Sequence, residues 1–282
     1  MLDVAAVRGA FEDLSDLAPL GVRSGQKDVL SGLRGSERIA LKLIKPTAQD
    51  ADRTLREIEA VARLDSDFVP HVLEHGSRSI SGEDRIYLIE QFIEGGSYRA
   101  SLTAGLRPAL PFVLDLAKAL LHACRDFEAA KLVHRDIKPE NIMIGTDGKI
   151  WVIDFGIVRL LDQESLTATS LRFGPFTPGY GAPEQVRNLK PQIDVRADLF
   201  SVGVVLYESL AGTNPHLVNK RDVLHVIQSM QQADLPRIDG IDAELADLVA
   251  SLTARFPSRR PRTAQDAIEW FDPIRARLQP ET

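Results

Sequence analysis

The chain has 282 residues, 44% hydrophobic and 26% charged, which is enough for the core of one large domain or two small ones. Its net charge of -6, without a long basic run, argues against nonspecific binding to nucleic acid or to an anionic membrane. A single cysteine, Cys124, excludes an internal disulfide, and no apolar run approaches the roughly 18 residues of a membrane span, so we expect a cytoplasmic protein.

The opening residues, 1–15, have the pattern of a short amphipathic helix. Val4, Val7, Phe11 and Leu14 fall on one face at helical spacing. The pattern predicts a helical extension. We interpret it as a helix that packs on the lobe that follows, in preference to a segment that binds a partner.

Short alternating runs dominate residues 16–93. Apolar side chains alternate between two faces in residues 38–44, and residues 85–92 form a second strand-like run. Between these runs, residues 51–64 carry apolar side chains at helical spacing. The sequence therefore predicts a strand-rich lobe with one main helix, followed by a linker at EGG, residues 94–96.

Helical patterns dominate the second part of the chain, residues 94–282. An apolar stripe runs through residues 111–129, and a hairpin is predicted at residues 142–153, where the runs IMI and IWVI flank the turn residues TDG. The sequence contains no internal repeat. Three further helices are predicted at residues 195–212, 221–230 and 243–256.

The segment HRDIKPEN, residues 134–141, concentrates polar and charged groups between a helix with an apolar end and the apolar run IMI. Asp136, Asn141 and Asp154 supply three side-chain oxygens on two loops that flank the predicted hairpin. Mg²⁺ prefers a few side-chain oxygens together with substrate phosphates. Each of these residues alone is more often a turn or cap residue, but the strings DFG and APE follow in order at residues 154–156 and 182–184.

These three strings carry a family resemblance. The chain is similar to eukaryotic-type (Hanks-type) serine/threonine protein kinases, whose signatures H-R-D-x-K-P-x-N, D-F-G and A-P-E are intact here. The resemblance covers residues 20–262, and the alanine- and arginine-rich style resembles bacterial members with a stand-alone catalytic domain. It implies an α+β, two-lobed protein-kinase fold with a strand-rich N-lobe at residues 16–93 and a helical C-lobe at residues 94–282.

The resemblance implies roles for four residues of the second lobe. Asp136 would accept or orient the proton of the substrate hydroxyl, and Lys138 would neutralise charge on the γ-phosphate of ATP. Asn141 and Asp154 would hold the two Mg²⁺ ions that bridge the phosphates. The implied cofactors are therefore ATP and Mg²⁺, and the implied partners are protein substrates. The sequence leaves the oligomeric state open.

In the first lobe, IALK at residues 39–42 is similar to the family's strand sequence V-A-I-K. Alternation along a strand puts Ala40 and Lys42 on one face, so Ala40 would lie against adenine and Lys42 would reach the α- and β-phosphates. Glu57 is the implied ion-pair partner of Lys42, and Glu59 is the weaker candidate. A lysine and a glutamate on such elements are otherwise ordinary surface groups.

The run LIEQFIEGGS resembles the hinge of the family. The backbone groups of Glu90 and Phe92 would contact the adenine edge, with Ile89 as the gatekeeper behind it. Main-chain groups do this work, so the identity of the side chains carries little information.

The glycine-rich loop departs from the family pattern. Where G-x-G-x-x-G-x-V is expected, LGVRSGQKDV has serine and lysine at the positions of two glycines. One interpretation is a stiffer loop with weaker nucleotide affinity and a solvated lysine. The other is that this lysine reaches the phosphates. The candidate nucleotide-binding residues of the loop are Gly21, Ser24, Gly25, Lys27 and Val29.

The segment between DFG and APE contains SLTATS, residues 165–170. We predict autophosphorylation at Thr167 or Thr169, with Arg135 able to bind the added phosphate. An ordinary exposed polar loop is the alternative. Thr177 matches the threonine that contacts the catalytic aspartate in the family, which favours a protein substrate over a small molecule.

Three structural roles complete the resemblance. Asp198 would anchor the backbone of the catalytic loop, with Phe200 in place of the usual tryptophan. Glu184 and Arg260 would form a buried ion pair. A pseudokinase that binds nucleotide with weak transfer activity is the alternative function, because the glycine loop is degraded.

Overall fold

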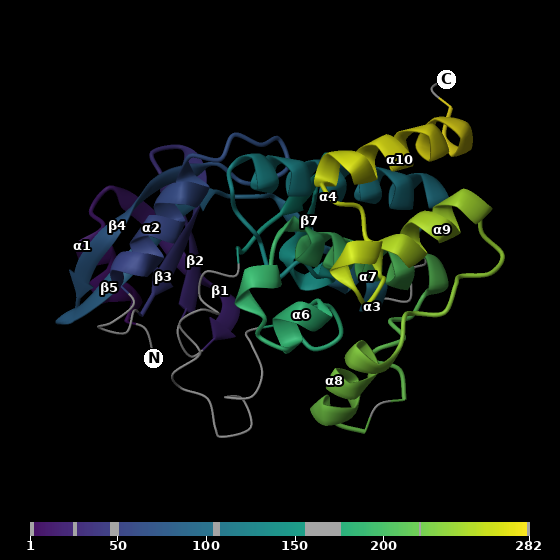
Figure 1. Cartoon of the computed structure of the whole chain (residues 1–282). Coiled ribbons are helices and arrows are strands. Elements are labelled where there is room, and N and C mark those ends of the chain that lie inside the picture. The colour runs from purple at the N-terminus through teal and green to yellow at the C-terminus, as the bar shows by residue number, and fades with distance from the viewer. Residues whose placement is uncertain are drawn as a thin grey trace. The chain divides into compact units, whose positions relative to one another are not determined.

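The computed structural model describes residues 3–24, 27–45, 51–103, 108–155, 176–219 and 221–280 (Figure 1). Contacts within the chain divide these residues into two compact units. The first unit contains the described residues up to Asp65 and Pro70–Glu94, and the second contains Ser66–Val69 and the described residues from Gly95 onward. Along the described ranges, no helix is both long enough and apolar enough to cross a membrane.

The first unit contains a five-stranded antiparallel sheet. Its elements are α1 Val4–Ala10, β1 Leu14–Ser24, β2 Lys27–Arg34, β3 Glu37–Ile44, α2 Ala51–Ala62, β4 Val72–Ile80 and β5 Glu83–Gln91 (Figure 1). The strands lie in the order β1-β2-β3-β5-β4. The predicted strands at residues 38–44 and 85–92 are confirmed as β3 and β5, and the predicted helix at residues 51–64 is confirmed as α2.

Strands β1, β2 and β4 were not predicted, and for the two edge strands, β1 and β4, the sequences explain why. Strand β1 contains Pro19 and two register shifts against β2, so its alternation is broken. An edge strand tolerates proline because one side of it lacks a partner strand. Strand β4 contains Gly76, and a Cβ there would lie 3.1 Å from the ring of Tyr87, so the glycine makes room for that ring.

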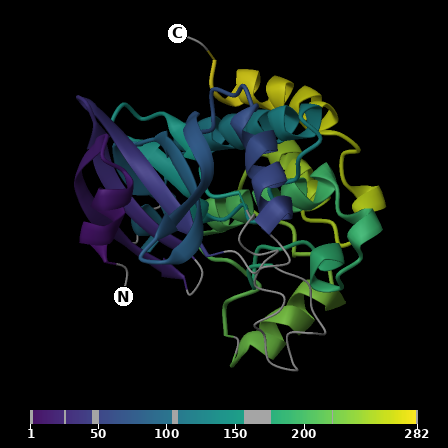
Figure 2. The same cartoon turned by 90° about the vertical axis from the view of Figure 1, so that its left-hand side faces the viewer.

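Each face of the sheet is covered by a different helix. Leu41 of β3 and Ile89 of β5 pack with residues of α1 in one buried cluster. Ile44 and Leu88 pack with Ile58 of α2 in another. Successive side chains of a strand point to opposite faces, so α1 and α2 lie on opposite sides of the sheet, as Figure 2 shows for the purple α1 and the violet-blue α2.

The opening helix is shorter than the predicted residues 1–15, because α1 ends at Ala10 and the chain then turns into β1. The ring of Phe11 meets Tyr87 edge-on at 5.0 Å. The guanidinium of Arg78 lies 4.3 Å from the centre of the Phe11 ring and donates a hydrogen bond to the Ala10 carbonyl. The prediction that this helix packs on the first lobe is confirmed.

The second unit is mainly helical, with a small three-stranded sheet in the order β6-β7-β8. The predicted hairpin is confirmed as β7 and β8, and the predicted helices as α4, α7, α8 and α9. The elements are β6 Gly95–Ser97, α3 Tyr98–Thr103, α4 Leu110–Ala129, β7 Ile142–Gly145, β8 Ile150–Val152, α6 Pro183–Val186, α7 Val195–Ala211, α8 Val223–Gln232, α9 Ala243–Leu252 and α10 Ala264–Leu278 (Figure 1).

Helix α7 is the buried centre of this unit and packs against α4 and α9. Asp194 caps its first turn, and Gly212 ends it in the left-handed conformation at φ +77°. A Cβ on Gly203 would lie 2.7 Å from the Leu252 side chain, so glycine lets α7 and α9 approach closely. Helix α10 packs on α4 and contains Pro273, which explains why its pattern did not predict a helix.

Candidate active site

The segment HRDIKPEN forms a loop and a short 3₁₀ turn before β7. The carboxylate of Asp198, on the buried helix α7, accepts hydrogen bonds from the backbone N–H groups of His134 at 2.7 Å and Arg135 at 2.8 Å. Burial raises the pKa of Asp198 to about 7, although these two donors favour its ionised form. The anchor holds Arg135 at φ +66°, a backbone conformation that L-residues seldom adopt.

Three side chains surround the carboxylate of Asp136. Thr177 donates from Oγ1 to Asp136 Oδ1 at 2.5 Å. Lys138 Nζ lies 2.9 Å from Asp136 Oδ2 and donates to Thr177 Oγ1 at 3.1 Å. Asn141 Nδ2 donates to Asp136 Oδ2 at 2.9 Å and to the Asp136 carbonyl at 2.8 Å. Four predicted site residues are therefore brought together within the second unit, and three of them orient the buried carboxylate of Asp136.

The buried ring of His134 fixes the loop at residues 134–141 through ring contacts and hydrogen bonds. Its ring lies 5.6 Å from the ring of Phe127 on α4 and 4.7 Å from the ring of Phe155, which follows Asp154. Nδ1 accepts from the Asp136 N–H at 3.3 Å, so the proton of the neutral ring is on Nε2, which donates to the Ile153 carbonyl at 3.2 Å. Burial lowers the pKa of His134 to about 4.

Glu184 and Arg260 form the predicted buried ion pair. The guanidinium donates to both carboxylate oxygens, at 2.6 Å and 3.1 Å, and both side chains are almost fully buried. The guanidinium of Arg260 also donates to the backbone carbonyls of Ala254 and Arg196 and lies 4.8 Å from the ring centre of Phe200. Phe200, which stands in place of the family's tryptophan, thus covers the guanidinium with its ring face.

A polar network that no sequence pattern indicated joins residues of α3, α7 and the loop 134–141. Arg99 of α3 donates to Glu140 of the catalytic loop and to Glu208 of α7, both at 2.8 Å, and to the hydroxyl of Tyr180. Tyr180 in turn donates to Glu208, and burial beside that carboxylate raises the pKa of Tyr180. No local pattern links these four residues, because they lie on four separate segments.

In the first unit, Lys42 and Ala40 share the face of the sheet that faces α2, as predicted from alternation. Lys42 and Glu90 are both buried, and the ammonium of Lys42 is ion-paired with the carboxylate of Glu90. Glu57 of α2 accepts from Arg53 at 3.2 Å. The ion pair between Lys42 and Glu57 stays a prediction, whereas Glu90 as a side-chain partner of Lys42 was not anticipated.

The strand register corrects the assignment of Ile89 as gatekeeper. Ile89 lies opposite Leu41 and is buried under α1, on the face away from Lys42. Glu90 lies opposite Ala40 and occupies the face of Lys42. The prediction was wrong by one position, and in a strand a shift of one residue reverses the direction of the side chain.

The backbone contacts predicted for Glu90 and Phe92 stay predictions. Counting the same spacing from Glu90 offers Gln91 and Ile93 as an alternative pair. Strand β5 ends at Gln91, whose N–H donates to the His71 carbonyl at 2.9 Å. The guanidinium of Arg38 lies 4.0 Å from the centre of the Phe92 ring.

The degraded glycine loop corresponds to the hairpin of β1 and β2. Gly21 has φ +72°, a conformation that favours glycine, and Ser24 pairs with Lys27 where the strands meet. Val29 lies opposite Lys42 in the pairing of β2 with β3. Three predicted site residues lie outside the described residues: Gly25, Thr167 and Thr169.

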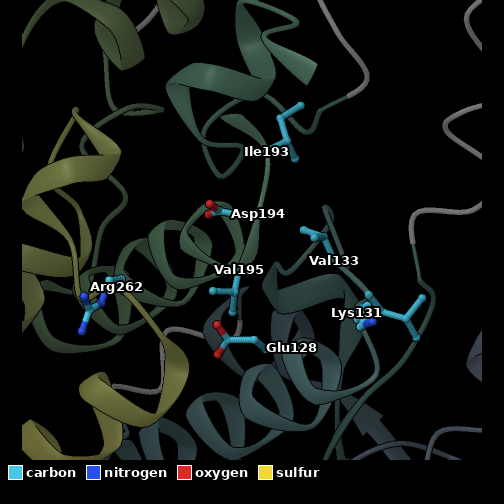
Figure 3. Close-up of a pocket in the computed structure, with 8 residues that line it drawn as sticks. Glu128, Lys131, Val133, Ile193, Asp194, Val195 and Arg262 are labelled. Atoms are coloured by element: carbon cyan, nitrogen blue, oxygen red, sulfur yellow. The ribbon is translucent and has the colours of Figure 1, made fainter. Parts of the chain in front are cut away.

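A separate pocket of about 260 Å³ lies in the second unit (Figure 3). Its wall includes Glu128, which accepts from the Ala264 N–H at 2.9 Å, and Asp194, which is ion-paired with Arg196. Both carboxylates are already engaged in contacts that stabilise the fold. Because the lining contains none of the predicted site residues, we do not assign the pocket a part in the activity.

Oxygen donors suited to Mg²⁺ are present on the two predicted residues. Both amide hydrogens of Asn141 are directed at Asp136, so its carbonyl oxygen is the atom left to bind a cation. Within the described ranges, no group of three histidine, cysteine or acidic side chains forms a closed protein cage for a metal. Asn141 and Asp154 fit an ion that keeps its remaining positions for phosphate and water.

Comparison with known proteins gives the family. A model described as protein kinase domain matches residues 28–271. Serine/threonine-protein kinase PknL of Mycobacterium tuberculosis H37Rv is 37% identical over 210 residues, which are 72% of this chain and 50% of that protein. Serine/threonine-protein kinase PknB of Mycobacterium leprae is 30% identical over 266 residues, 90% of this chain and 41% of that protein. The chain spans about half or less of these relatives, and it belongs to the protein kinase domain family.

Proposed function

We propose that the chain is a protein kinase domain that uses Mg²⁺ and ATP to phosphorylate serine and threonine hydroxyls of proteins. The observation that supports this best is the orientation of the Asp136 carboxylate by Thr177, Lys138 and Asn141. The relatives that carry the name serine/threonine-protein kinase support the hydroxyl class. They are longer than this chain, so the activity and substrates of the whole protein belong to the proposal.

Asp136 is the proposed acceptor for the proton of the substrate hydroxyl. A carboxylate oxygen has two lone pairs, so Oδ1 can accept from Thr177 and from a substrate at once. The hydroxyl oxygen forms the new bond to the γ-phosphorus, the bond from that phosphorus to the ADP oxygen breaks, and the proton passes to Asp136. Lys138, whose ammonium lies 2.9 Å from Asp136, is the proposed cation that neutralises the charge on the transferring group.

Asn141 and Asp154 are the proposed Mg²⁺ ligands. Asn141 and Asp154 would hold the metal, which would neutralise part of the negative charge of the phosphates. The donation of the Asn141 amide hydrogens to Asp136 supports this role, because it couples the cation ligand to the carboxylate that receives the substrate proton.

The proposed nucleotide contacts come from the first unit. Ala40 packs against adenine, Lys42 reaches the α- and β-phosphates, and Glu57 supports Lys42. Backbone groups at the end of β5 contact the adenine edge, either those of Glu90 and Phe92 or those of Gln91 and Ile93. The hairpin of β1 and β2 covers the phosphates through its backbone, and the proposed residues of the hairpin are Gly21, Ser24, Gly25, Lys27 and Val29.

Thr167 and Thr169 are the proposed autophosphorylation sites, and Arg135 is the proposed partner of the added phosphate. The guanidinium Nε of Arg135 is buried, and no acceptor for it exists among the described residues. A buried donor without an acceptor is costly, so a phosphate oxygen would satisfy it.

The test is phosphate transfer from ATP to a serine- and threonine-containing peptide library, with phosphosites on the chain mapped by mass spectrometry. Asp136→Asn keeps the shape of the side chain and removes its basicity, so we expect transfer to fall by about 10²- to 10⁴-fold. Asp247→Asn changes the same chemical group on the exposed face of α9 and should retain transfer.

Equal transfer by the wild type and Asp136→Asn would contradict the proposal. Binding of ATP without transfer in either protein would favour the pseudokinase alternative. Labelling of a small metabolite without any labelled protein would favour a small-molecule kinase.

A further inference from the structure

Glu90 places a carboxylate beside Lys42 on the α2 side of the sheet in the first unit. The two residues are ion-paired across β3 and β5, and their side chains are 8% and 11% exposed. The register puts Glu90 opposite Ala40 and Leu88 opposite Lys42, so lysine and glutamate are diagonal neighbours on one face. A carboxylate therefore neutralises the ammonium that we assign to the phosphates.

The surroundings make this contact strong. Ile44, Ile58, Ile86 and Leu88 form a buried apolar cluster on the same face. Two charges in such surroundings are weakly screened by solvent, and neither is stable there without an opposite charge or strong hydrogen bonds. Glu90 is thus held to Lys42 by burial as well as by its place in β5.

We propose that Glu90 is a specificity-determining residue that competes with nucleotide phosphates for Lys42. This inference rests on the proposed function, because it takes Lys42 to be the phosphate-binding lysine. A phosphate that approaches Lys42 meets an ammonium already neutralised by a carboxylate, so it gains less from contact with Lys42. The pair lowers affinity for phosphorylated nucleotides while leaving affinity for the nucleoside part unchanged.

Competition with phosphate can be distinguished by experiment from a purely structural role of the ion pair. A pair that only compensates for burial affects the melting temperature but does not discriminate between ligands with and without phosphate. A pair that competes with phosphate lowers the affinity for ADP and does not change the affinity for adenosine. The ratio of the two affinities is therefore the informative quantity.

The experiment measures the dissociation constants of ADP with Mg²⁺ and of adenosine by calorimetry, for the wild type and for Glu90→Gln. Glutamine keeps an oxygen for Lys42 and removes one negative charge. We expect ADP to bind about tenfold more tightly and adenosine to change by less than about twofold. Glu83→Gln is the matched control, because Glu83 is also on β5 and is paired with Lys45, but both side chains are exposed. It should change neither affinity.

Further variants test whether the effect of Glu90 on ADP affinity depends on Lys42. In a Lys42→Met background, the gain in ADP affinity from Glu90→Gln should shrink to less than about twofold. Glu90→Met supplies a neutral side chain of similar length if Glu90→Gln does not fold. An unchanged or weakened affinity for ADP in both neutral variants overturns the inference.

Transfer activity distinguishes this result from failure of the proposed function. If the wild type transfers phosphate and binds ADP but Glu90→Gln binds ADP equally well, the inference is wrong and the function stands. If the wild type neither binds ADP nor transfers phosphate, the function is wrong and the inference is wrong with it.

Discussion

Thr177 Oγ1 lies 2.5 Å from Oδ1 of Asp136, although the two residues are 41 positions apart in the chain. The hydrogen bond joins the segment that precedes α6 to the loop at residues 134–141. Lys138 reaches both residues, so the three side chains form one closed triangle of contacts. The direction of the Asp136 carboxylate is therefore set by a residue outside its own motif.

Removal of the Thr177 hydroxyl should impair transfer without affecting nucleotide binding. Thr177→Val keeps the shape but frees Asp136 to rotate, so we expect kcat to fall by about a hundredfold, the typical effect of misplacing a reacting group. Thr177→Ser restores the hydroxyl and serves as the control. Steady-state kinetics check this, and a change confined to the KM for ATP would contradict it.

Loss of Arg260 should destabilise the second unit. Arg260→Met leaves the carboxylate of Glu184 buried without its cation, which costs about 3 to 5 kcal/mol in the free energy of unfolding. Urea unfolding measures this cost. The control is Arg259→Gln, because Arg259 is exposed and its partner Asp234 lies at 3.5 Å, and it should cost less than about 0.5 kcal/mol. Equal costs in the two variants would show that burial does not matter here.

The neutral ring of His134 should make stability depend on pH. Its pKa of about 4 in the folded state lies below the ordinary value of 6.5, so the unfolded chain binds the proton first as the pH falls. The stabilisation is present above pH 6.5 and is lost between pH 6.5 and 4. The pKa of Asp198 is raised to about 7, so the folded state binds this proton first as the pH falls. Between pH 7 and 4, Asp198 therefore adds to the free energy of unfolding as the pH falls.

A comparison of variants isolates the contribution of His134. At pH 7 the wild type should exceed His134→Gln in unfolding free energy, and by pH 5 this difference should shrink by about 2 kcal/mol, since 1.5 pH units correspond to about 1.4 kcal/mol each. Urea unfolding at the two pH values gives the difference. A gap that stays constant between them would mean that His134 titrates normally.

Phosphate on the segment that contains Thr167 and Thr169 should act through Arg135. Treatment of the autophosphorylated protein with a phosphatase should lower transfer by about tenfold, because one to three charge-assisted hydrogen bonds are lost. Arg135→Gln should be insensitive to the treatment. Arg262→Gln, at a residue whose side chain is 88% exposed, should respond like the wild type. A phosphatase response that persists in Arg135→Gln would assign the phosphate to another partner.

Much of this protein was determined by local patterns in its sequence. Alternation predicted β3 and β5, helical spacing predicted α2 and α4, and the order of HRDIKPEN, DFG and APE indicated the family, because each of these signals is contained in a short stretch. The pair of Glu184 and Arg260 was also predicted, since the family motif includes both positions. The edge strands β1 and β4 were missed, because Pro19 and two register shifts break the alternation of β1 and Gly76 interrupts that of β4.

Tertiary structure alone decided which face of β5 meets Lys42. The sequence IEQF is compatible with either Ile89 or Glu90 on that face, and the register with β3 selects Glu90. The network of Arg99, Tyr180 and Glu208 likewise arises only when α3, the segment before α6 and α7 come together. Motifs in the sequence determined the residue types available for chemistry, and the folded chain decided which buried charges became partners, because a buried charge is stable only beside its counterion.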